Sequence, residues 1–299
     1  MMNPSDNFRG AALMAASMAA YVMNDATIRL VSSDLGIFQI MLLRGVFSTA
    51  MLGAIAWHRK TIFPPLQKGD WKLMIYRGIG EVGATLCFLT ALFNMPLANA
   101  SAILQALPLA VTLGAAVFLG ESVGWRRYLA IIVGFIGVIV IVRPGSDSFN
   151  AYSMWALAAV FFIVLRDLTT RRLSDHVPSI FVALLSSIFI TVTGAVLSPT
   201  MEWKPVSSND LQLLAGAALF LVFGYLFSIM TMRVGEVSFI SPFRYTSLIW
   251  SIILGFVIFG ETPDDWTLVG SSIVVVMGIY TFYRERKILK QDRLARASV

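Results

Sequence analysis

Long apolar runs of close to twenty residues recur along the whole chain and are separated by short polar connections. A helix needs about 20 apolar residues to cross the roughly 30 Å hydrocarbon core of a bilayer. The runs are continuous and do not alternate with polar residues, which favours helices over strands. We therefore expect an all-α polytopic membrane protein with ten transmembrane helices, at residues 8–31, 36–57, 72–94, 97–119, 126–143, 152–172, 178–198, 210–232, 236–259 and 265–283.

The amino-acid composition indicates whether the chain is surrounded by lipid or binds nucleic acid. Hydrophobic residues make up 57% of the 299 residues and charged residues only 13%, whereas a soluble domain carries about 25% charged residues. The net charge of +6 would suit nucleic acid, but the basic residues lie in short connections and form no stripe with interleaved aromatic side chains. The expected partner is the lipid bilayer, and nucleic acid is not expected.

The basic residues also predict an orientation. If the connections alternate between the two sides, eighteen of the 23 Lys and Arg residues fall on the side of the N-terminus and three on the other, while Arg44 and Arg244 stay within the membrane. Basic connections face the cytoplasm. Both termini are therefore expected to be cytoplasmic.

Cofactor and metal sites are not expected. The single cysteine, Cys87, lies in an apolar run, and the two histidines, His58 and His176, lie in basic connections. The glycines of residues 78–83 match a dinucleotide fingerprint, but no strand precedes them and they lie in a membrane helix. No P-loop and no hydrolytic motif is present. We expect no cofactor, no direct use of ATP and no enzymatic activity.

An internal repeat relates the two halves of the chain. The matching motifs are residues 25–29 with 167–171, Ile37-Phe38 with Ile180-Phe181, Asp70 with Asp210, and Gly120-Glu121 with Gly260-Glu261, at offsets of 140 to 143 residues. Because each repeat has five helices, an odd number, the second copy enters the membrane from the opposite side. Inverted repeats of this kind are typical of transporters. The expected units are a first repeat over 1–145, an inverted second repeat over 146–284, and a basic cytoplasmic tail over 285–299.

Several motifs resemble the drug/metabolite transporter superfamily, and specifically its EamA-like ten-helix members. They are Leu43-Arg44-Gly45, the stretch 98–108 that opens the fourth helix, and the two Gly-Glu pairs. The resemblance implies a secondary transporter of a bacterial inner membrane, with amino-acid exporters of the YddG type as the nearest subgroup. The second half departs from the family pattern, because Leu248 replaces the proline expected deep in the ninth helix and Pro242 lies earlier.

Charged groups within the hydrocarbon cost several kcal/mol unless they meet a cavity or a partner, and therefore indicate function. The charged candidates are Asp25, Arg44, Glu81, Arg166, Asp167 and Arg244, and the polar Asn24 beside Asp25 joins them. Two readings stay open for Asp25: an ion pair with Arg44, or a direct role with substrate or protons. Glu81 could be a structural partner of Arg77, four residues earlier on the same helix. For Arg244 we expect a position facing the cavity, where it would meet a substrate carboxylate.

Polar faces of the fourth and ninth helices add further candidates. Ser101 and Gln105 share one helical face, and at the repeat offset Ser241 and Tyr245 share another. With Trp250 and Phe243 as an apolar wall, these faces would suit a small amphiphile, although ordinary hydrogen bonding between helices is the alternative. Glu121 and Glu261 are expected to be caps or gate contacts.

The expected function is transport of small organic metabolites by alternating access, with amino-acid export as the leading expectation and protons permitted as coupling ions. The first alternative is another metabolite class, such as a nucleoside-like or sulfonium compound, taken up or exchanged. An intramembrane enzyme would need paired catalytic groups at one depth, which the scattered acids do not supply. A sensor would usually append a soluble domain, and the connections here are short.

Overall fold

The computed structural model describes residues 4–120, 124–146, 149–174, 176–234 and 240–297. The helices are α1 (Pro4–Val31), α2 (Ile37–His58), α3 (Lys68–Asn94), α4 (Leu97–Leu104), α5 (Leu107–Leu119), α6 (Trp125–Val142), α7 (Tyr152–Arg171), α8 (Ser179–Leu197), η1 (Ser198–Thr200), α9 (Ser208–Val234), η2 (Ser241–Tyr245), α11 (Thr246–Phe259) and α12 (Asp265–Ala297). With α4–α5 and η2–α11 each forming one crossing, these helices make ten passes. The ten-helix, all-α prediction is confirmed.

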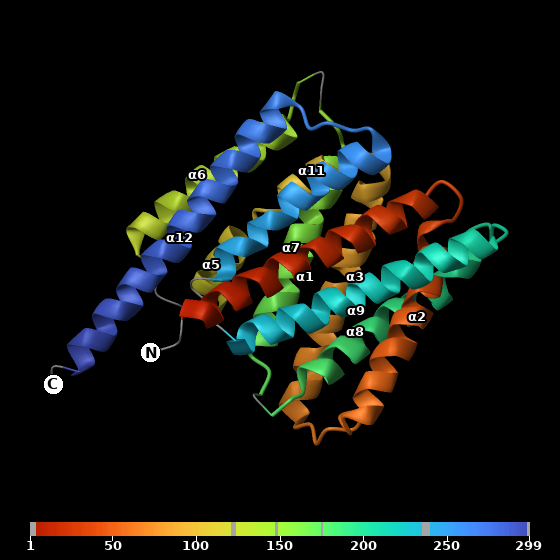
Figure 1. Ribbon diagram of the computed structural model, residues 1–299, viewed down its shortest axis with the longest axis horizontal. Helices are drawn as coiled ribbons and strands as arrows, with labels where there is room; N and C mark the ends of the chain where they lie inside the picture. Colours follow the sequence, from red (N-terminus) through yellow and green to blue (C-terminus); the bar gives the residue numbers. More distant parts are fainter. Residues whose placement is uncertain (1–3, 121–123, 147–148, 175, 235–239, 298–299) are drawn as a thin grey trace.

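Nine of the crossings in the described part of the chain are long and apolar enough to span a membrane, and α1 is not among them. α1 is rich in alanine and contains Asn24 and Asp25, which lower its hydropathy. It nevertheless crosses the bundle alongside α9 (Figure 1). The start of α1 and the end of α12 lie at the same end of the bundle (Figure 1), which we call the terminal face, and the other end is the opposite face.

Helix packing follows the inverted repeat. Helix α1 packs along α9, and its counterpart α7 packs along α3, the counterpart of α9. The pairs α2–α8 and α6–α12 each join a helix to its own counterpart. Figure 1 shows α6 and α12 side by side along one edge of the molecule. Every large contact therefore has a partner under one pseudo-two-fold rotation.

Local structure repeats as well. Asp70 and Asp210 each accept a hydrogen bond from the backbone N–H three residues earlier, at 3.3 and 2.9 Å, and so cap α3 and α9. Gly120 and Gly260 each end a helix in the left-handed conformation, with φ of 68° and 66°, which glycine adopts without strain. The sequence matches at these positions thus reflect shared helix ends.

Glycines allow the self-paired helices to approach closely. A Cβ atom on Gly194 of α8 would lie 2.5 Å from the backbone nitrogen of Leu42 on α2. A Cβ on Gly137 of α6 would lie 2.8 Å from the carbonyl oxygen of Gly270 on α12. Small residues at such crossings are how membrane helices pack without a hydrophobic driving force.

Two details differ from the expected helices. The crossing at 97–119 is broken between α4 and α5, because Pro108 lacks an N–H and disfavours helical geometry just before it. Helix α12 continues to Ala297, so most of the expected tail is helical. Residues 236–239 of the expected ninth helix lie outside the described residues.

Candidate functional site

A cavity of about 520 Å³ lies between the two halves, within helices α1, α2, α3, α7, α8 and α9. Its charged lining residues are Asp25, Arg44, Arg77, Glu81, Arg166, Asp167 and Arg244. Aromatic groups also line it, among them Tyr21, Phe88 and Tyr225. The cavity therefore offers both signs of charge and flat apolar surfaces to a solute.

The lining residues come from equivalent places in the two repeats. Helix α1 contributes Tyr21, Asn24, Asp25 and Ile28, and α7 contributes, 142 residues later, Ile163, Arg166, Asp167 and Thr170. Helices α3 and α9 contribute Glu81, Thr85 and Phe88 and, 140 residues later, Leu221, Tyr225 and Ser228. Since equivalent positions meet around one space, the pseudo-two-fold axis passes through the cavity. Inverted-repeat transporters bind substrate at such a place.

The cavity reaches toward the terminal face. Its lining includes Ser179, the first residue of α8, and Thr170, near the end of α7. Toward the opposite face, α1, α2, α3, α8 and α9 enclose a buried apolar cluster, in which Ile28 and Leu92 are completely buried. The apolar cluster separates the cavity from the opposite face in this conformation.

A polar clamp joins helix ends at the opposite face. Both oxygens of the Glu261 carboxylate accept hydrogen bonds from the Arg29 guanidinium at 2.5 Å. Glu261 also accepts a hydrogen bond from the backbone N–H of Leu97 at 3.3 Å, and Arg29 stacks over Phe259 with 4.4 Å to the ring centre. The clamp therefore ties the end of α1 to the start of α4 and to the end of α11.

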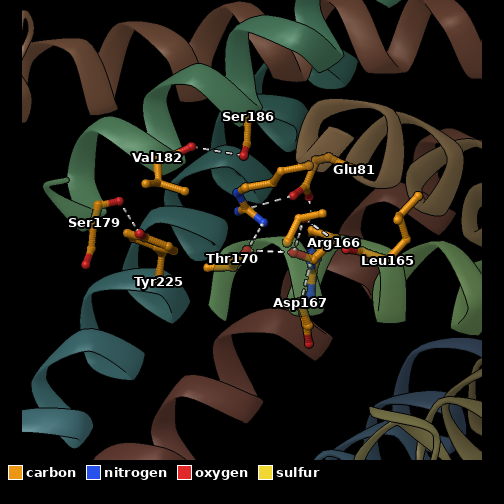
Figure 2. A network of polar contacts seen from close by, with 11 residues as sticks. Glu81, Leu165, Arg166, Asp167, Thr170, Ser179, Val182, Ser186 and Tyr225 are labelled. Atoms are coloured by element: carbon orange, nitrogen blue, oxygen red, sulfur yellow. Dashed lines mark hydrogen bonds and ion pairs between the residues drawn. The ribbon is translucent and has the colours of Figure 1, made fainter. Parts of the chain in front are cut away.

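On the α3–α7 side of the cavity, four charged groups pair with one another. Glu81 lies 3.5 Å from both Arg77 and Arg166, and Arg166 also donates a hydrogen bond to Asp167 at 2.9 Å. Figure 2 shows Arg166 between the two carboxylates. Arg77 in addition donates to the Thr170 hydroxyl at 3.0 Å. The predicted i, i+4 pair of Arg77 with Glu81 is present, and α7 supplies a further arginine.

The charges of α1 and α2 are arranged differently. Arg44 donates a hydrogen bond to the Asn24 side-chain oxygen at 3.2 Å, and the Asn24 amide donates to Asp25 at 2.9 Å. Asn24 therefore stands between the two charges, and the Asp25–Arg44 ion pair, one of the two readings of the sequence, is not formed. Within the described part of the chain, Asp25 has no ion-pair partner.

Arg244 lies in η2, next to the start of α11, and lines the cavity with an exposed side chain. Its side chain forms no ion pair or hydrogen bond with any described residue. Its position in the first repeat is taken by Leu104, which also lines the cavity. The expected cavity-facing position of Arg244 is the one observed.

The polar faces of the fourth and ninth crossings lie outside the cavity wall. Gln105 donates a hydrogen bond to the Ser247 hydroxyl at 2.9 Å and so links the two crossings, which is the alternative reading of these polar residues. Ser101 and Ser241 are buried. Tyr245 is buried against α12, where a Cβ on Gly278 would meet its ring. Trp250 packs against the apolar cluster, and Glu121 lies outside the described residues.

Sequence reasoning missed several lining residues, including Tyr21, Tyr225 and the serines 179, 186 and 187 of α8. The repeat offset could have found part of them, because Tyr21 lies one turn before Asp25 and matches a lining residue of α7. The α8 serines carry no charge and resemble ordinary helix-packing residues, so the sequence alone does not single them out.

Similarity to known proteins identifies the family of the chain. The family model for EamA-like transporters matches residues 8–143 and again residues 150–284. The chain belongs to the EamA-like transporter family. The two matches follow the two inverted repeats, and the members of this family are transporters and not enzymes.

Curated relatives of the chain are bacterial transporters with different named substrates. They are a riboflavin transporter of Vibrio cholerae (28% identical, covering 76% of each chain), an S-adenosylmethionine uptake transporter of Rickettsia felis (25%, covering 92% of each), and the pseudopaline exporter CntI of Pseudomonas aeruginosa (24%, covering 87% of this chain and 91% of that one). Among the solved structures that match, one crystal structure has a TM-score of 0.63 at 17% identity and covers 93% of this chain and 98% of that one, which shows the shared fold alone. The protein is a small-molecule transporter in a membrane.

Proposed function

We propose that this protein is a secondary transporter for a nucleoside-like sulfonium metabolite of the S-adenosylmethionine type, moved by alternating access of the two repeats. The observation that carries the proposal is the cavity on the pseudo-two-fold axis, with charges of both signs on its wall. Such a substrate carries a sulfonium, an ammonium and a carboxylate group together with a flat purine.

The chemistry of the cavity suits this class. Its volume of about 520 Å³ lies within the range of roughly 300–1,000 Å³ that holds drug-sized ligands. Carboxylates attract the sulfonium and ammonium groups, arginines attract the carboxylate, and Tyr21, Phe88 and Tyr225 offer rings to the purine and to cations.

The relatives favour this class over amino-acid export. The Rickettsia felis relative aligned over 92% of both chains is an S-adenosylmethionine uptake transporter, and none of the three relatives described above is named for an amino acid. Export of simple amino acids, the leading expectation from the sequence, therefore becomes the second candidate. Uptake is the direction we propose.

Orientation and coupling complete the proposal. The terminal face would be cytoplasmic, because the basic connections lie there, and the membrane would be a bacterial inner membrane. The cavity in this conformation would then face the cytoplasm. Protons are the coupling ions that we propose, and the acidic residues of the cavity wall are where they would bind.

The test is uptake of radiolabelled S-adenosylmethionine by proteoliposomes, with and without a pH gradient, beside a panel of amino acids and riboflavin. We expect saturable uptake of S-adenosylmethionine that an excess of unlabelled compound abolishes. Empty liposomes are the control. Flux of amino acids without flux of S-adenosylmethionine would contradict the proposed substrate class. Flux of none of the compounds would also contradict it and would exclude amino acids and riboflavin as substrates.

A further inference from the structure

We propose that the cavity recognises a dipolar substrate through two separate residues, Asp25 for the positively charged sulfonium group and Arg244 for the carboxylate. This inference rests on the proposed function and names the residues that would select within the substrate class. It follows from which charges of the cavity are already neutralised by protein partners and which are not.

Most of the charged lining residues have protein partners. Glu81 is shared by Arg77 and Arg166, and Asp167 is held by Arg166 at 2.9 Å. These four groups satisfy one another between α3 and α7, and a substrate charge would have to break an existing pair to reach them. Arg44 is buried and directs a guanidinium nitrogen to Asn24.

Asp25 is the acidic residue of the cavity that can still pair with a cation. One of its oxygens accepts the hydrogen bond from Asn24, and the side chain has no ion-pair partner among the described residues. An ionised carboxylate within a membrane is costly without a countercharge, so a substrate cation that arrives there is stabilised strongly. Asp25 lines the cavity and is only partly buried, which keeps it accessible.

Arg244 is the basic residue of the cavity that can still pair with an anion. It lines the cavity, its side chain is exposed, and it has no hydrogen-bond or ion-pair partner in the described part of the chain. A guanidinium group presents two parallel N–H donors, which match the two oxygens of a carboxylate. An arginine that meets no protein carboxylate across an aqueous cavity is therefore suited to bind that of a substrate.

The two groups lie on neighbouring elements. Helix α1 packs against η2, which carries Arg244, and Tyr21, Asp25 and Arg244 line the same cavity. Tyr21 lies four residues before Asp25, a rise of about 6 Å along the helix at ~1.5 Å per residue. Because both groups line one cavity, a substrate that occupies it can meet the carboxylate and the guanidinium together.

Two analogues of S-adenosylmethionine test the two contacts separately. S-adenosylhomocysteine lacks the sulfonium charge, and decarboxylated S-adenosylmethionine lacks the carboxylate. Dissociation constants of the three compounds are measured by titration calorimetry on the purified full-length protein and on Asp25→Asn and Arg244→Gln. Asp25→Glu and Arg244→Lys, which keep the charge, guard against a loss that reflects folding alone.

In Asp25→Asn, we expect the preference for S-adenosylmethionine over S-adenosylhomocysteine to fall roughly tenfold or more, the size of one charge-assisted hydrogen bond, while the preference over the decarboxylated compound stays. In Arg244→Gln, we expect the reverse. Unchanged preferences in both variants would overturn this inference and leave the proposed function standing. A wild-type protein that binds none of the three compounds would overturn the proposed substrate class itself.

Discussion

Asp25 on α1 and Asp167 on α7 occupy matching places in the two repeats, yet the two acids have different neighbours. The residue before Asp167 is Arg166, which pairs with it and with Glu81 across to α3. The residue before Asp25 is Asn24, which donates one hydrogen bond and brings no charge. The repeat thus supplies two equivalent acids, and a single neighbouring residue decides which of them has an ion-pair partner among the described residues.

The same contrast extends to the other lining positions. Glu81 on α3 has Leu221 as its counterpart on α9, and Arg244 in η2 has Leu104 as its counterpart on α4. The backbone is therefore nearly symmetric, as alternating access needs, while the charges are not. In our proposal the symmetric part of the sequence serves the alternating motion, and the asymmetric charges select what is bound.

The largest loss of protein stability is expected for Arg166→Leu. It leaves Glu81 with one arginine and Asp167 with none. Because these side chains are only partly exposed, losing the shared partner costs more than the ~1 kcal/mol of a solvent-exposed pair. We expect a marked loss of monodisperse protein and a lower unfolding temperature in detergent. The matched variant Asn24→Leu should cost less, because it removes hydrogen bonds and no charge. Equal losses would contradict the assignment of Arg166 as a structural partner.

The next largest effect, a loss of transport, is expected when the neighbour of Asp25 is made the same as the neighbour of Asp167. Asn24→Arg places an arginine before Asp25, as Arg166 stands before Asp167. We expect a folded protein whose transport falls roughly tenfold or more, because a charge-assisted hydrogen bond now occupies Asp25. Asn24→Gln keeps a neutral amide at this place and is the control. Full transport by Asn24→Arg would show that Asp25 need not be free.

A smaller effect is expected at the opposite face, where Glu261→Gln weakens the clamp. The Arg29–Glu261 pair is partly exposed, so its loss should shift the conformational equilibrium by about 1 kcal/mol, or roughly fivefold. The readout is maleimide labelling of Ala98→Cys, a buried position at the start of α4, in a Cys87→Ala background. Faster labelling is expected, and an unchanged rate would contradict a gating role.

Asp264→Asn is the matched control for the clamp. The carboxylate pairs with Arg143 and is more exposed than Glu261, and it joins α6 to α12, whose helices already meet at their glycines. Burial alone would raise the pKa of Asp264, but hydrogen bonds from Thr267 and Arg143 lower it overall. Its contribution to stability is thus present above the ordinary pKa and lost only as the pH falls through the lowered one. Labelling at neutral pH should match that of the parent protein.

Much of the fold follows from the sequence, because hydropathy and the Asp and Gly-Glu matches are local patterns that define helices and their order. The ion-pair partners of the charged cavity residues cannot be predicted from the sequence, because they depend on contacts between helices that are distant in the chain. Arg166 reaches Glu81 from 85 residues away, and a pattern within one helix suggests only Arg77. Likewise, periodicity places Ser101 and Gln105 on one face of a helix, but it does not tell which neighbour that face meets.

Radiolabelled S-adenosylmethionine uptake by Asp25→Asn and Asp167→Asn, reconstituted side by side at equal protein amounts, tests the contrast between the two acids most directly. The acids are equivalent in the repeat, and the substitution is the same. We expect uptake by Asp25→Asn to fall roughly tenfold or more. Asp167→Asn should keep a substantial share of it, because Arg166 still pairs with Glu81. Equal losses in the two variants, or a larger loss in Asp167→Asn, would contradict the account.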